Sequence, residues 1–152
     1  MKKDLAPLQI IQKEYRFGNC VWLHNKKGRK KGLADIWDPR KIDDPYTLYL
    51  AVVGNGFSMP IELNSDILDA VGELAKDGAD EYSSTALSGF KINRDADKVH
   101  YVISVDSVYV RRVKFVHQLQ NVYHDITGDE LSVPIRSVLF PIVWFSPDNI
   151  TL

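Results

Sequence analysis

The chain has 152 residues, of which 45% are hydrophobic and 26% are charged, with a formal net charge of −1. This is the composition of a globular protein long enough to bury a core without metal or cross-links. Cys20 is the only cysteine, which excludes an internal disulfide. The most apolar run, residues 138–145, is far shorter than the roughly 20 residues of a membrane helix.

We therefore expect a single compact domain spanning residues 1–152. The N-terminus has a basic start but no long apolar run and no small-residue cleavage site, so no signal peptide is expected. The lone thiol of Cys20 fits a reducing compartment. We expect the protein to be soluble, cytoplasmic and not inserted in a membrane.

Charge is distributed unevenly along the chain. Residues 1–42 carry a formal charge of +7, residues 43–97 carry −8, and residues 98–152 are neutral. Such segregation predicts either one cationic and one anionic surface, or two segments that neutralise each other across a sheet. The sequence leaves both alternatives open.

The N-terminal third predicts strands. Residues 8–17 are rich in β-formers and end at a turn, Gly18-Asn19. Residues 20–24 and 33–37 then predict a β-hairpin with its tip at residues 25–32. Val21 and Leu23 would share one face of this hairpin, with Trp22 on the other. Residues 39–45, bracketed by prolines, are expected to form a loop.

The middle of the chain predicts a second hairpin followed by a helix. Residues 47–53 and 57–63 would pair across Gly54-Asn55-Gly56, because Asn-Gly favours a type I′ turn. Residues 66–77 then predict an amphipathic helix, with Ser65 as N-cap and Gly78 as C-terminal cap. The acidic and small-residue stretch 79–89 is expected to be a loop.

Strand patterns return after residue 98. Residues 99–105 alternate apolar and polar as a half-buried strand does. Residues 107–126 fit either strands or a helical stripe, and we favour strands because Val, Tyr and Phe are frequent there. Residues 126–131 predict a turn, and residues 132–145 a final strand or pair. The predicted fold class is α+β, a mostly antiparallel sheet of six or seven strands with helix 66–77 packed on it.

Residues 26–31 contain more positive charge than folding requires. Clustered cations between glycines can converge on phosphates, and tryptophans on the flanking strands can stack against bases. The alternative is a lysine-rich hairpin tip that keeps strand edges soluble, with the two tryptophans in the core. The candidate anion-binding or nucleic-acid-binding residues are Lys26, Lys27, Arg29, Lys30, Lys31, Trp22 and Trp37.

No catalytic, metal or cofactor motif is recognisable. His117 and His124 do not have the spacing of a zinc site, and no G-x-S-x-G elbow or phosphate-binding glycine loop is present. We expect no metal and no cofactor. An enzyme or small-ligand binder with a pocket between helix 66–77 and loops 39–45 and 79–89 is kept as a third hypothesis.

The favoured hypothesis is a small non-enzymatic protein, an inhibitor or adaptor, that binds a macromolecular partner through its charge-segregated surface. Its acidic stretch 66–81 would imitate nucleic-acid charge and bind a cationic protein surface. The candidate partner-binding residues are Asp69, Glu73, Asp77 and Asp80. The first alternative is a nucleic-acid-binding protein that uses the basic tip. A homodimer through residues 138–145 is left open, although burial in the core is favoured.

Overall fold

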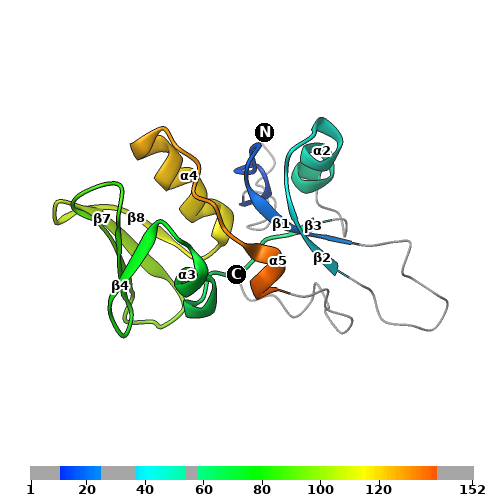
Figure 1. Ribbon diagram of the computed structural model, residues 1–152. Helices are drawn as coiled ribbons and strands as arrows, with labels where there is room; N and C mark the ends of the chain where they lie inside the picture. Colours follow the sequence, from blue (N-terminus) through cyan, green and yellow to red (C-terminus); the bar gives the residue numbers. More distant parts are fainter. Residues whose placement is uncertain (1–10, 25–36, 54–57, 140–152) are drawn as a thin grey trace, which may run out of the picture. The chain divides into compact units, whose positions relative to one another are not determined.

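The computed structural model describes residues 11–24, 37–53 and 58–139, and its fold is α+β (Figure 1). The chain divides into two compact units, residues 1–61 with 135–152 and residues 62–134. Each unit has its own antiparallel sheet, of three and five strands. The expected single sheet of six or seven strands is therefore wrong. The single compact domain stays a prediction.

The three-stranded sheet has the order β2-β1-β3, formed by β1 (Cys20–His24), β2 (Trp37–Lys41) and β3 (Ser58–Met59). The first predicted hairpin is present, but β1 pairs with Trp37–Lys41 rather than with residues 33–37. Part of the predicted loop 39–45 is therefore strand. The predicted tip, residues 25–32, lies outside the described residues.

The predicted second hairpin is wrong, because Pro45–Val53 forms helix α2. Proline suits the first position of a helix, where no amide hydrogen bond is lost. Asp44 caps the helix: its carboxylate accepts from the Thr47 backbone N–H at 2.8 Å and from the Thr47 hydroxyl at 2.6 Å. This Asp-Pro start outweighs the β-forming side chains that follow it. The predicted turn, residues 54–56, lies outside the described residues.

The rest of this unit also departs from the predicted strands. Residues 11–15 form a helical turn, in which the Glu14 N–H donates to the Ile11 carbonyl at 3.1 Å. Helix α5 (Ile135–Val138) replaces the start of the predicted final strand, and the remainder of that strand, from residue 140, lies outside the described residues. The core of the unit contains Tyr15, Val21, Leu23, Ile42 and Ala51, with Leu48 and Leu50 packed against it.

The five-stranded sheet is a meander in which each strand pairs with the next in the chain. Only short loops or turns are needed between such neighbours. The strand predicted at 99–105 is confirmed over residues 101–105, as β7. The strands are β4 (Leu74–Gly78), β5 (Glu81–Ser84), β6 (Phe90–Arg94), β7 (Tyr101–Val105) and β8 (Val108–Val113).

The predicted helix 66–77 is wrong over its second half. Helix α3 spans only Ser65–Ala70, and its N-cap is Asn64, whose side chain accepts from the Ile67 N–H at 3.0 Å. Val71 leaves the helix in an extended conformation. Gly72, which weakens a helix, follows at once, and β4 then pairs with β5. Residues 81–84 of the predicted loop 79–89 are therefore strand.

Segment 107–126 contains both a strand and a helix, the two alternatives considered for it. Val108–Val113 is strand β8, whereas Val116–Thr127 is helix α4. The Gln118 side chain stabilises the start of α4 by accepting from the backbone N–H groups of Lys114 and Phe115. Gly128, with φ of 78°, ends the helix as a left-handed cap, so the turn predicted at 126–131 is a helix C-terminus.

Helices α3 and α4 both contact the same face of the five-stranded sheet. Tyr82 of β5 hydrogen-bonds to α3, and the Phe90 ring of β6 meets the Tyr123 ring of α4 edge-on at 5.7 Å. In the middle of this face, Tyr82, Phe90, Ile92, Tyr101 and Ile103 are buried. On the opposite face, Ser83, Lys91, Ser104 and Tyr109 form one cross-strand row and are half-buried or exposed.

Candidate functional site

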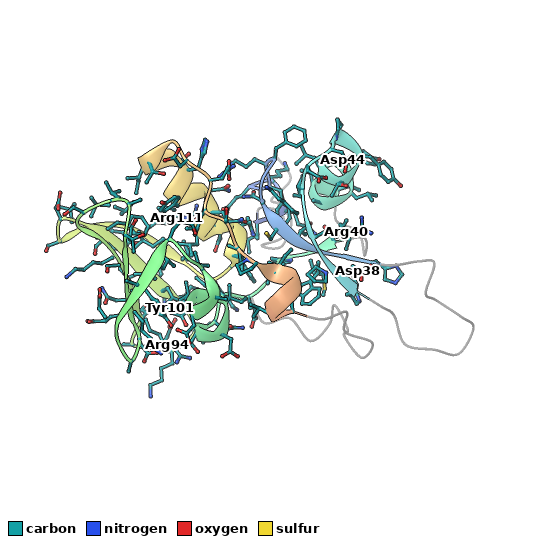
Figure 2. All side chains as sticks on the ribbon, in the orientation of Figure 1. Asp38, Arg40, Asp44, Arg94, Tyr101 and Arg111 are labelled. Carbon is teal, nitrogen blue, oxygen red and sulfur yellow. The ribbon has the colours of Figure 1, made fainter. Side chains whose placement is uncertain are left out.

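The five cations of the predicted basic tip, at positions 26, 27 and 29–31, lie outside the described residues. The described strands bring the two ends of this segment together, since His24 and Trp37 are paired in the β1–β2 register. On β2, Asp38 and Arg40 are paired with Leu23 and Val21 (Figure 2). A hairpin that presents the basic tip stays a prediction.

The two flanking tryptophans are part of the core. Trp22 is only 4% exposed and Trp37 only 1%. The His24 ring contacts the Trp37 ring edge-on, with centroids 5.1 Å apart. Bases need an open aromatic face for stacking, so this arrangement speaks against the stacking role predicted for both residues. The sequence left both alternatives open for the tryptophans: Trp22 is buried because β1 is buried on both faces, and Trp37 is buried at the start of β2.

The sequence puts Asp69, Glu73 and Asp77 on the predicted helix 66–77 and Asp80 in the loop after it, but the structure puts all four in different elements. Asp69 belongs to α3, Glu73 lies between α3 and β4, Asp77 belongs to β4, and Asp80 lies in the turn before β5. Glu73 is half-buried, and its carbonyl and carboxylate oxygens accept backbone N–H groups of Thr85 and Ser132. Glu73 therefore ties segments of the unit together.

Asp69 connects α3 to the sheet. The Tyr82 hydroxyl donates to Asp69 Oδ1 at 2.6 Å, and the Lys76 ammonium lies 3.6 Å from the same oxygen. Burial, and then the hydrogen bond to Asp69, raises the pKa of Tyr82 above its ordinary value. The Asp69 carboxylate is therefore engaged within the unit and is a poor choice for a partner contact.

Asp80 is paired in a similar way with Arg94, whose Nη1 lies 3.6 Å from Asp80 Oδ1. Arg94 and Tyr101 are paired across β6 and β7, and Figure 2 shows their side chains close together. Burial raises the pKa of Tyr101, while the positive charge of Arg94 opposes that shift. No arrangement of nucleophile and base emerges from these contacts.

Asp77 and Glu81 differ from Asp69, Glu73 and Asp80 in their surroundings. Both side chains are exposed, and neither forms an ion pair within the described residues. They lie at the β4–β5 turn, where Gly78 and Glu81 are paired and the register is bulged. We name the pair Asp77 and Glu81 the acidic hairpin.

A charge network that the sequence did not predict lies at the β6–β7 turn. Arg112 Nε is 2.7 Å from Asp95 Oδ2, and Arg112 Nη2 contacts the Asp97 carboxylate. Asp97 also accepts from the backbone N–H groups of Val99 and His100, each at 2.9 Å. These backbone hydrogen bonds, His100 first, lower the pKa of Asp97 well below its ordinary value.

This network includes one member of a further group of cations, Arg111, Arg112 and Lys114. Arg112 is neutralised by two carboxylates, and the Lys114 side chain is only 7% exposed, 3.9 Å from Glu62. Arg111 is half-buried (Figure 2). Arg112 and Lys114 are therefore each held by carboxylates of their own unit.

We expect the contribution of Asp97 to folding stability to depend on pH. Because the folded pKa of Asp97 is lowered from 3.8, its contribution to stability is fully present above 3.8 and is lost progressively as the pH falls from there through the folded pKa. Asp97→Asn should therefore lower the urea midpoint at about pH 6, with a smaller difference at about pH 2.5. Urea unfolding at both pH values measures this. An equal difference at both would contradict an ionic contribution from Asp97.

Within the described parts of the chain, no three His, Cys, Asp or Glu side chains are grouped so that they could hold a metal ion. Over the same residues, no helix is both long and apolar enough to cross a membrane. No protein family, curated protein or solved structure matches this chain. Its function is therefore inferred from its own geometry and charge.

Proposed function

We propose that this chain is a non-enzymatic binding protein, an inhibitor or adaptor, that contacts a macromolecular partner through charge. The supporting observation is that charge divides along the two compact units. Residues 62–134 contain seven Lys or Arg against thirteen Asp or Glu, a formal charge of −6, and the remaining residues carry +5. Segregated charge speeds association with an oppositely charged surface.

The partner that best fits the acidic unit is a protein with a cationic surface, and the acidic hairpin is the contact that we propose on this side. Asp77 and Glu81 are exposed and add negative charge without an internal counter-ion among the described residues. Asp69, Glu73 and Asp80 instead stabilise the unit itself. Neutralising these three would disturb folding and binding together.

The proposal is tested by affinity capture from the native cell extract at low and high salt, with bound proteins identified by mass spectrometry. The expected result is a defined basic protein that is lost at high salt, since rim charges are screened. The double variant Asp77→Asn/Glu81→Gln should weaken its capture at least about tenfold.

A matched control removes the same two charges elsewhere on the acidic unit. Asp125 and Asp129 are exposed residues near the C-terminal end of α4. Asp125→Asn/Asp129→Asn should retain the partner. Equal loss in both double variants would indicate dependence on net charge alone, and capture without salt dependence would contradict the proposal.

Nucleic acid stays the alternative partner, because the other unit carries the +5 charge. With Trp22 and Trp37 buried, this alternative depends on cations alone, mainly those of the basic tip. Capture of nucleic acid instead of protein, lost when Lys26, Lys27, Arg29, Lys30 and Lys31 are replaced by alanine, would favour it over the acidic hairpin.

A further inference from the structure

Strand β8 is the outer strand of the five-stranded sheet, beside β7 (Figure 1). Its first three residues are apolar and exposed: Val108 by 66%, Tyr109 by 63% and Val110 by 41%. An edge strand presents unpaired backbone N–H and C=O groups, and proteins commonly guard such edges with charges, prolines or bulges. The start of β8 carries neither charge nor proline.

The chain itself begins to pair with this edge and then leaves it. The Leu63 N–H donates to the Lys114 carbonyl at 2.9 Å, and Glu62 forms a bridge with Phe115. Asn64 then caps α3, which directs the chain away. Among the described residues, no strand therefore lies beside β8 itself.

The β7–β8 turn determines which backbone groups face this open edge. Asp106 and Ser107 both have positive φ, as in a two-residue type I′ turn, and Val105 and Val108 form the closing pair. In such a hairpin the closing pair is hydrogen-bonded and the next pair, here Ser104 with Tyr109, is not. The N–H and C=O groups of Tyr109 therefore point away from β7.

The side chains along this edge are self-complementary. Asp106 precedes the apolar residues 108–110, and Arg111 and Arg112 follow them. An antiparallel copy centred on Tyr109 places Val108 opposite Val110 of the other chain, so that the exposed apolar residues of the two copies pack together, while Arg112 stays bound to Asp95 and Asp97 of its own chain. A shift of register towards the arginines would instead bring like charges together.

We propose that β8 pairs with β8 of a second copy of this chain, antiparallel and about a two-fold axis at Tyr109, to join two five-stranded sheets edge to edge. The contact is isologous, as in most homodimers. This inference is independent of the proposed function. It differs from the homodimer seam considered from the sequence, which used residues 138–145.

The strength of the contact follows from its size. The β7–β8 register shifts between Ile103 and Ser104, which bulges β8 near Val110 and shortens the ladder available to a second copy. An interface this short falls below about 1,200 Å² in total, in the weak and transient class. We therefore expect a dissociation constant on the order of 100 µM.

Sedimentation velocity of the full chain, from about 10 µM to about 1 mM, tests the proposal. The parent should shift from monomer to dimer over this range. Tyr109→Lys should remain monomeric throughout, because it places two ammonium groups directly opposite each other. Tyr49→Lys is the matched control: Tyr49 lies on α2, is 62% exposed, and undergoes the same chemical change. This variant should dimerise like the parent.

A second measurement tests the register. Residues directly opposite in a hydrogen-bonded antiparallel pair have Cα atoms about 5.5 Å apart, within the range of a disulfide. Tyr109→Cys should therefore oxidise to a covalent dimer at least about tenfold faster than Tyr49→Cys. The buried Cys20 does not compete. A parent that stays monomeric at about 1 mM, or equal oxidation rates for the two cysteines, would overturn the proposal.

Discussion

Replacing Trp37 with alanine is expected to lower the free energy of unfolding by about 3 to 5 kcal/mol, the usual cost of removing a large buried aromatic side chain. Trp37 is 1% exposed and is paired with His24 at the start of β2. Its loss would leave a cavity beside the three-stranded sheet. Urea unfolding followed by circular dichroism measures the change.

Trp37→Phe is the matched control for this experiment. It keeps an aromatic ring in the core and should cost distinctly less than Trp37→Ala, because the cavity is smaller. A loss below about 1 kcal/mol for Trp37→Ala would contradict the burial of this side chain. The role of Trp37 as a stacking surface for bases would then become tenable again.

Gly89→Ala is expected to cost about 2 to 5 kcal/mol, because two penalties combine. Gly89 has φ of +85°, and a left-handed backbone costs other residues roughly 1–2 kcal/mol. An added Cβ would also lie 2.0 Å from Asp106 Oδ1 and 3.2 Å from the Asp106 nitrogen. Overpacking of this kind costs roughly 1–3 kcal/mol.

Two other glycines separate these penalties. Gly128 has φ of +78° but no described atom within 4 Å of an added Cβ, so Gly128→Ala should cost only the backbone term, roughly 1–2 kcal/mol. Gly72 has neither constraint, and Gly72→Ala should be neutral or slightly stabilising. Urea unfolding should rank the costs as Gly89, then Gly128, then Gly72. Equal costs at Gly89 and Gly128 would show that Asp106 moves aside freely.

The sequence predicted correctly those elements whose pattern is local and of one kind. Residues 101–105 alternate between buried and partly exposed positions, so period two identified β7. Strand β1 was also predicted correctly, because its β-forming residues precede a turn-rich segment. In both cases the side-chain pattern and the backbone preference favour the same element.

Errors arose where a short capping signal opposed a longer propensity. Residues 46–53 favour a strand by composition, but Asp44 and Pro45 begin a helix there. The opposite error was made at β4. The apolar stripe at helical spacing placed most of this strand in the predicted helix 66–77, but the chain leaves helix α3 at Val71. Asp-Pro before α2 and Gly128 after α4 were readable signals. The early end of α3 was not readable, because it depends on pairing between β4 and β5.

The sequence by itself determined the α+β class, the absence of an internal disulfide and the segregation of charge along the chain. These properties depend on composition and short-range pattern. Only the tertiary structure decided which charges remain exposed. Arg112 is neutralised by Asp97, fifteen residues away, and Asp69 is bound by Tyr82, thirteen residues away. Such pairs form because strand pairing brings residues that are distant in the sequence next to each other. No local stretch of sequence determines the register of that pairing.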